Sequence, residues 1–131
     1  LLKVRGYDSK IRIVNDFSNP IQKGSSLVLW ARTNSDVILG SDAIGELRKS
    51  SEAVAREAAK NLLDEIQAKP TVDIHLADML IPYIALADGE SIYSTRFITD
   101  HIESNMWLVN EILGVSLTVE KSGSLIRLSK R

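Results

Sequence analysis

The stretch FITDHIESNMWLVNEIL, residues 97–113, joins a polar start to an apolar periodicity and predicts an amphipathic helix. Apolar side chains recur three and four positions apart, which is the spacing of one helical face; they are Ile102, Met106, Val109 and Leu113. Asp100 followed by Glu103 fits an N-terminal capping arrangement. Gly114 supplies the left-handed residue that ends many helices. His101 is therefore expected on the first turn of this helix.

His101 is the candidate reacting group of this helix. The backbone N–H groups of a first helical turn point outward, and the positive end of the helix dipole disfavours a protonated imidazole. A neutral imidazole is a nucleophile near pH 7, and the same N–H groups can hold a phosphate beside it. A histidine near a helix start is also a common surface residue. The residues alone leave both interpretations open, a nucleophile toward phosphorus and a solvated side chain.

The segment DIHLADML, residues 73–80, places a second histidine close to an acid. His75 and Asp78 are three residues apart at the start of another predicted helix, so both side chains can share one face. Three interpretations fit this pair: a divalent-metal site completed by His101, a nucleotide pocket in which the His75 ring stacks on a base, or a hydrated helix start capped by Asp73. On the residues alone, the hydrated helix start is the favoured interpretation.

The helix that begins near His75 is expected to run to about Ala87, and its shared face is Leu76, Met79, Leu80, Tyr83 and Ala87. Pro82 lies inside this pattern. Because proline has no N–H, it removes one backbone hydrogen bond and pushes away the carbonyl four residues earlier, which belongs to Asp78. Another helix is predicted over residues 51–68, capped by Ser50.

Runs of alternating or apolar residues predict the strands. They are residues 10–14 (KIRIV), a hairpin of 27–32 and 36–40 around TNS, residues 91–98, and a closing hairpin over 115–130 around Ser122-Gly123. Residues 41–50 are expected to form a loop. The order of these elements predicts an α+β fold, with helices on one face of an antiparallel or mixed sheet.

Composition narrows the possible functions. The chain has 131 residues, no cysteine and a formal net charge of −1. These features exclude disulfides, zinc–thiolate sites and cysteine nucleophiles, and they give no overall cationic surface for nucleic acid. No apolar run approaches the roughly 20 residues of a membrane span, so no membrane association and a cytoplasmic location are expected. No phosphate-binding P-loop, dinucleotide fingerprint or Gly-x-Ser-x-Gly elbow occurs.

Four blocks of the sequence resemble the C-terminal part of the RNA 3′-terminal phosphate cyclases. They are GSSLVLWART, VILGSDAIGE, HLADMLIPYIALADG and ITDHIESNMWLVNEILGV, within a match from about Leu27 to Val119. Members of this family carry a block like LADQL…ALA followed by a short H-x-x-T-N helix. These appear here as LADML…ALA and HIESN.

The resemblance implies a fold and a division of the chain. The family fold is a repeated unit of two helices on one face of a four-stranded sheet, similar to the C-terminal domain of bacterial translation initiation factor three. Residues 1–25 would be the end of a small inserted domain and a linker, and residues 26–131 the C-terminal catalytic repeat. The opening in mid-pattern without Met also predicts a piece of a longer protein.

The resemblance also implies a reaction. His101 would attack the α-phosphorus of ATP and carry AMP, with help from a divalent metal, Mg or Mn. The AMP would pass to an RNA 3′-phosphate, which then closes to a 2′,3′-cyclic phosphate. Asp78 would lie in the nucleotide site, Met79 beside the adenine and His75 over its face. Met79 stands where relatives often have Gln, so an amide contact to the base is lost or replaced.

The partners implied are RNA 3′-phosphate ends and the N-terminal remainder of the same enzyme. The family's glycine-rich N-terminal signature has no counterpart in these residues, so this chain alone is expected to lack half of the ATP site and to be inactive. The alternative is a non-catalytic cyclase-like protein that binds RNA or assists ribosome assembly. The histidine of the H-x-x-T-N block argues against that alternative, because a protein without the reaction has no need of the ring.

Overall fold

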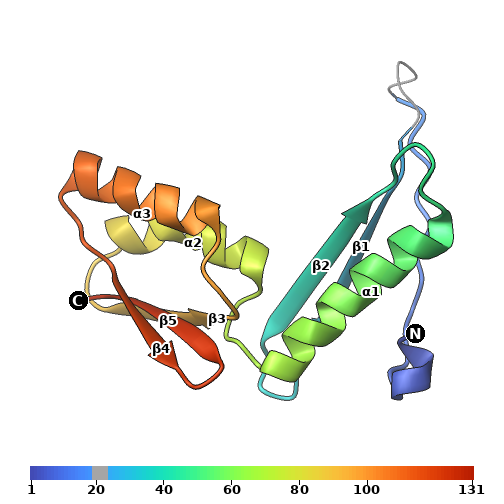
Figure 1. The fold of residues 1–131 in the computed structure, drawn as a ribbon, viewed down its shortest axis with the longest axis horizontal. Helices are drawn as coiled ribbons and strands as arrows, with labels where there is room; N and C mark the ends of the chain where they lie inside the picture. Colours follow the sequence, from blue (N-terminus) through green and yellow to red (C-terminus); the bar gives the residue numbers. More distant parts are fainter. Residues whose placement is uncertain (19–23) are drawn as a thin grey trace.

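The computed structural model describes residues 1–18 and 24–131, which form two halves (Figure 1). In the first half, the 3-10 helix η1 (Lys3–Arg5) precedes a hairpin of β1 (Ser26–Arg32) and β2 (Ile38–Ile44), and α1 (Ser51–Ala68) lies along that hairpin. The second half contains α2 (Ile74–Leu86), β3 (Ser91–Thr95), α3 (Asp100–Leu113), β4 (Thr118–Ser122) and β5 (Leu125–Lys130).

The first half is held together by alternate side chains of the hairpin that turn toward α1. Leu27 and Leu29 of β1 pack with Ala43 of β2 against Val54 and Ala58 of α1. Such alternation is expected of a strand with one buried face. The prediction of a loop over residues 41–50 is therefore wrong at its start, since β2 continues to Ile44 in register with β1.

The second half has the larger core. Its sheet has the order β3-β5-β4 with antiparallel neighbours, and α2 and α3 lie together over one face of it (Figure 1). The fully buried side chains that join these layers are Ala77, Ile81, Ile102 and Leu128. A two-residue turn at Gly123-Ser124 closes the last hairpin, and Gly123 adopts a φ of +64°, which suits glycine.

The predicted helices are confirmed, with one error in the orientation of α2. Ser50 and Asp73 cap α1 and α2 as expected, accepting from Ala53 N at 3.2 Å and Leu76 N at 2.9 Å. On the face that the spacing grouped together, Leu76, Met79 and Tyr83 are exposed and Leu80 and Ala87 are partly buried. The buried residues of α2 are Ala77, Ile81, Ile84 and Ala85. Apolar residues surround most of this helix, so spacing alone does not identify its buried side.

The α+β class is confirmed, but the described residues form two separate sheets of two and three strands rather than one of four. The hairpin buries its side chains against α1, so it does not extend the β3-β5-β4 sheet. The strand predicted over residues 10–14 is wrong: these residues are exposed and form no ladder. Alternation does not make a strand where no neighbouring strand supplies hydrogen bonds.

Asp73 joins the two halves. Besides capping α2, its carboxylate accepts a hydrogen bond from the backbone N–H of Gly40 in β2, with 2.8 Å between Gly40 N and Asp73 Oδ2. A methyl group added at Gly40 would lie 3.3 Å from that oxygen, so the Asp73 carboxylate lies close against the Gly40 backbone. The free edge of β2 is thus bound by the first turn of α2 instead of by another strand.

Glu65 and Arg96 make a second junction. The Glu65 side chain of α1 is fully buried, and Arg96, which follows β3, donates from Nε to Oε1 at 2.9 Å. Within the described residues, Oε2 has no hydrogen-bond partner. Burial raises the pKa of Glu65, and the Arg96 guanidinium only partly offsets this effect.

We expect Asp73→Ala to lower the free energy of unfolding by about 1–3 kcal/mol, since it removes a helix cap and a bond between the halves. Asp73→Ser is the matched variant, because serine can still cap α2 but is too short to hold Gly40 as well. Urea unfolding should rank the serine variant between wild type and alanine. Equal losses for serine and alanine would show that the cap contributes nothing.

The raised pKa of Glu65 predicts a pH-dependent stability. A carboxyl group whose pKa is higher in the folded chain stabilises the fold at low pH, and this contribution is lost as pH rises through the folded pKa. Wild type should therefore lose stability relative to Glu65→Gln as pH rises from about 4 to 7. Asp64→Asn, the control, removes a more exposed partner of Arg96 at 3.8 Å but keeps Glu65, so its stability should follow the wild-type pH trend. Parallel curves for wild type and Glu65→Gln would contradict the assignment.

Candidate functional site

The first turn of α3 carries His101 as an exposed side chain. The helix is capped by Thr99, whose hydroxyl accepts from Ile102 N at 3.1 Å, while Thr99 O accepts from Glu103 N at 3.1 Å. The prediction that Asp100 is the cap is wrong: Asp100 is the first helical residue. Both residue types cap helices, and the spacing from Asp100 to Glu103 pointed to the wrong one.

The surroundings of His101 are those of a helix N-terminus. The first N–H groups of α3 have no partner within the helix, which is general for helix N-termini, and the positive end of the dipole lies there. A phosphate can be bound at such a place, next to the imidazole. Asp100 and Glu103 put two carboxylates on the same turn, so a bound polyphosphate would need cations to offset them.

Asp78 lies on the side of α2 that faces α3. Its carboxylate oxygen Oδ1 accepts a hydrogen bond from the Thr99 hydroxyl at 2.5 Å, and its backbone carbonyl accepts one from Asn105 Nδ2 at 3.3 Å. Asp78 is only partly exposed. It therefore contacts the helix that carries His101 directly, at the N-terminal cap and one turn further on.

Tyr93 approaches the same segment of α2 from β3. Its buried hydroxyl donates to Ala77 O at 2.8 Å. Burial raises the pKa of Tyr93, and the nearby charge of Asp78 raises it further, so the hydroxyl stays protonated and remains a donor. The backbone around Ala77 and Asp78 thus receives donors from both β3 and α3.

His75 and Met79 occupy a different face of α2, turned to solvent. They are four residues apart and lie side by side on the helix surface, and Met79 is 65% exposed. His75 Nε2 lies 3.2 Å from Asp42 Oδ1, so the first turn of α2 touches β2 here as well. An exposed ring next to an exposed thioether can form one wall of a site for a flat ligand. A second wall would have to come from outside the described residues.

The interpretation of His75, Asp78 and His101 as a metal site is wrong. Within residues 1–18 and 24–131, no group of three or more His, Asp or Glu side chains could hold an ion. His75 pairs with Asp42 and Asp78 with Thr99, on different faces of α2. A divalent ion near His101 would need most of its ligands from the nucleotide or from other parts of the enzyme.

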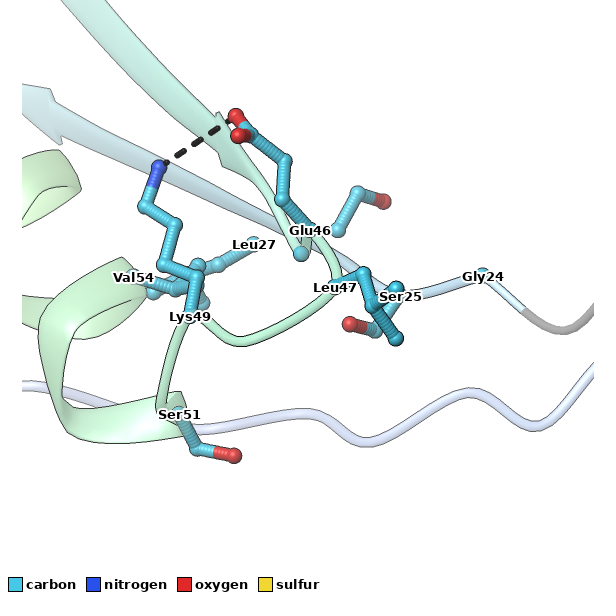
Figure 2. Close-up of a pocket in the computed structure, with 10 residues that line it drawn as sticks. Gly24, Ser25, Leu27, Glu46, Leu47, Lys49, Ser51 and Val54 are labelled. Atoms are coloured by element: carbon cyan, nitrogen blue, oxygen red, sulfur yellow. Dashed lines mark ion pairs between the residues drawn. The ribbon is translucent and has the colours of Figure 1, made fainter.

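A sizeable cavity lies elsewhere in the described part of the chain. It has a volume of about 640 Å³ and is found where the open end of the β1–β2 hairpin meets the start of α1 (Figure 2). None of the predicted site residues lines it. Lys49, the cation in its wall, is already paired with Glu57 at 2.7 Å and Glu46 at 3.6 Å.

The two glycines of GSDAIG are explained by packing around this hairpin. Gly40 faces Asp73, and a Cβ at Gly45 would lie 2.0 Å from Ser25 Oγ. Both positions are therefore crowded, and a side chain there would press on Asp73 or on Ser25. Separately, no helix among the described residues is long and apolar enough to cross a bilayer.

The structure adds Thr99, Asn105 and Asp42 to the residues that the sequence indicated. The sequence held an indirect indication of the Asn105 contact. Pro82 was expected to free the Asp78 carbonyl, and a free carbonyl needs a hydrogen-bond donor. Asp42 had none, since its contact with His75 depends on how the two halves meet. Of the four predicted site residues, Asp78 is brought to the helix of His101, whereas His75 and Met79 share a separate open face.

Comparison with known proteins gives consistent matches. Residues 2–67 match a family model described as "RNA 3′-terminal phosphate cyclase (RTC), insert domain". A protein of Thermococcus onnurineus named RNA 3′-terminal phosphate cyclase is 42% identical over 115 residues, covering 87% of this chain and 33% of the relative. One of Korarchaeum cryptofilum with the same name is 46% identical over 97 residues, covering 74% and 27%.

A third protein of that name, from Methanosarcina acetivorans, is 36% identical over 129 residues and covers 98% of this chain and 34% of the relative. The chain thus spans about a third of the length of the curated relatives it matches. The insert-domain match is continuous across residues 25 and 26, and the domain boundary placed there stays a prediction.

Proposed function

Because the chain belongs to the RNA 3′-terminal phosphate cyclase family, we propose that it is part of an ATP-dependent enzyme that converts an RNA 3′-phosphate into a 2′,3′-cyclic phosphate. The observation that carries this proposal is the exposed position of His101 on the capped first turn of α3. An imidazole at that position lies beside the N-terminal N–H groups of the helix, where a phosphate can bind, and its exposed ring can be reached by a ligand.

In the proposed reaction a ring nitrogen of His101 attacks the α-phosphorus of ATP. A P–N bond forms, the bond to the β-phosphate oxygen breaks, and pyrophosphate leaves. An oxygen of the RNA 3′-phosphate then displaces the imidazole and takes over the AMP. The neighbouring 2′-hydroxyl attacks the activated 3′-phosphorus, loses its proton and expels AMP. Direct closure would have to expel an oxygen of the 3′-phosphate as hydroxide, which is a poor leaving group. After activation the leaving group is AMP, so ring closure is easier.

A divalent cation, Mg or Mn, would neutralise phosphate charge during these displacements. Asp100 and Glu103 could each supply one oxygen ligand at the first turn of α3, and oxygen ligands suit both ions. The other ligands would come from the triphosphate and from the rest of the enzyme. This assignment also explains how a polyphosphate could approach a helix start that carries two acids.

The nucleotide base is proposed to lie on the open face of α2. His75 would cover the adenine ring and Met79 would contact its edge, since both are exposed and adjacent. Asp78 lies between this face and the first turn of α3, where it accepts a hydrogen bond from Thr99. We place it in the nucleotide site as well. The contact of Met79 would be apolar and would not select a hydrogen-bonding pattern on the base.

The missing wall is proposed to come from the N-terminal remainder of the same enzyme. Leu76, Met79, Tyr83 and Leu86 form an exposed stripe along α2, each 39–69% accessible, and Asp78, the acid of this helix, faces α3. A helix that is apolar on all sides is typical of a buried position. The isolated fragment should accordingly be inactive, and the complete enzyme should act on RNA 3′-phosphate ends in the cytoplasm.

We expect His101→Ala to abolish transfer of label from α-labelled ATP to the full-length enzyme in the presence of Mg²⁺ or Mn²⁺. The label on wild type should be labile in acid and stable in alkali, as a phosphoramidate is. Glu111→Gln, an exposed change near the other end of α3, is the control and should label normally. Undiminished label on His101→Ala would refute the nucleophile assignment. A wild-type enzyme without label would favour the non-catalytic alternative.

The remainder of the enzyme should protect the α2 stripe from solvent. Hydroxyl-radical oxidation, followed by mass spectrometry, should modify Met79 and Tyr83 strongly in the 131-residue chain and weakly in the full-length enzyme. Trp30, which is 68% exposed on the outer face of the hairpin, serves as an internal reference for radical dose in the fragment. Equal oxidation of Met79 and Tyr83 in both proteins would exclude this face as the contact.

A further inference from the structure

Pro82 leaves a gap in the hydrogen bonding of α2 that α3 fills. In an uninterrupted helix the N–H of residue 82 would donate to the carbonyl of residue 78, and proline has no N–H. The side-chain amide of Asn105 takes its place, with 3.3 Å between Asn105 Nδ2 and Asp78 O. A carbonyl this close to the interior needs such a donor, because an unpaired polar group there costs free energy.

The side chain of the same aspartate, Asp78, holds the beginning of α3. Asp78 Oδ1 accepts from the Thr99 hydroxyl, and that hydroxyl oxygen accepts from the N–H of Ile102. The hydroxyl is therefore oriented by both partners: its proton points to α2 and its lone pair to the first turn of α3. Charge on the acceptor shortens and strengthens such a bond.

His101 lies between these two attachment points in the sequence, on a helix whose inner side is fixed. Ile102, its neighbour, is fully buried, whereas the His101 ring is exposed. Few contacts of the ring itself can therefore set its position. The backbone of the first turn sets it, and that backbone is held by Thr99 before the histidine and by Asn105 one turn after it.

We propose that Thr99 and Asn105 are positioning residues of the cyclase reaction, which hold the His101 imidazole in place by docking α3 on the carboxylate and on the proline-freed carbonyl of Asp78. This inference rests on the proposed role of His101 as the nucleophile. The rate of an in-line displacement depends strongly on alignment, so a small displacement of the attacking ring nitrogen slows the reaction. Loss of either attachment should slow transfer to His101 without weakening ATP binding.

The test measures label transfer from α-labelled ATP to the full-length enzyme, as the rate at saturating ATP and as the ATP concentration for half that rate. Asn105→Ala should lower the saturating rate about three- to tenfold, the range expected for one hydrogen bond, with the half-saturating concentration unchanged. Asn110→Ala is the matched control: it lies on the same helix and loses one side-chain bond, to Ser116 Oγ at 2.8 Å, away from α2. It should label at the wild-type rate.

Pro82→Ala provides a second, specific check. This substitution would restore a backbone N–H for the Asp78 carbonyl, so Asn105→Ala should cost clearly less in the Pro82→Ala background than in wild type. Thr99→Val should also slow labelling, and Thr99→Ser, which keeps the hydroxyl, should restore most of the rate. Amide hydrogen exchange over the first turn of α3 should be faster in Thr99→Val than in Thr99→Ser.

The outcomes separate this inference from the function on which it rests. Label on wild type with unchanged rates in Asn105→Ala and Thr99→Val overturns the positioning role alone. A raised half-saturating ATP concentration with an unchanged saturating rate also overturns it, because it would indicate direct contact with the nucleotide. If Asn105→Ala slows labelling equally in the wild-type and Pro82→Ala backgrounds, the positioning role is overturned as well. A wild-type enzyme that takes no label overturns both proposals.

Discussion

The arrangement of both halves depends on α2, a 13-residue helix whose backbone and capping groups are bound by four neighbouring elements, β2, β3, α3 and β5. Asp73 at its start holds β2 through the N–H of Gly40. Ala77 and Asp78 in its middle accept from β3 and α3. At its end, the Lys130 ammonium of β5 donates to the carbonyls of Ala85 and Ala87, which places a cation at the negative end of the dipole. Movement of α2 would therefore disturb the hairpin, the sheet and the candidate site together.

Polar groups join the two halves. The two apolar clusters are separate, and the bonds between the halves come from Asp73, His75, Glu65 and Arg96 with their partners. Polar junctions fix geometry through the direction and length of their hydrogen bonds, whereas the hydrophobic effect is non-directional. The buried Glu65 shows the cost of this solution, because burial opposes its ionisation even beside a guanidinium.

The sequence predicted what depends on local spacing and failed where distant segments decide. The extents of α1 and α2, the caps Ser50 and Asp73, and the glycine stop of α3 follow from neighbours within a few positions. The strand expected over residues 10–14 and the single four-stranded sheet required knowledge of pairing, which local alternation does not contain. In the site, His101 was placed on the correct turn, but its cap was assigned one residue late.

The Asp78 carbonyl shows how a local feature of the sequence leads to a long-range contact. Proline removes the N–H that would have bound this carbonyl, and Asn105 of another helix binds it instead. The missing N–H of Pro82 could be recognised from the sequence, and with it the need for a donor, but the donor itself lies 27 residues from Asp78 on another helix. Pro82 would normally weaken the helix that contains it. Here the weakness gives α3 a specific place to dock, which a regular helix with all its carbonyls occupied would not offer. A histidine that must stay exposed to react cannot be fixed by burial. Its helix is fixed from the inner side instead, by a hydroxyl and an amide that meet one aspartate.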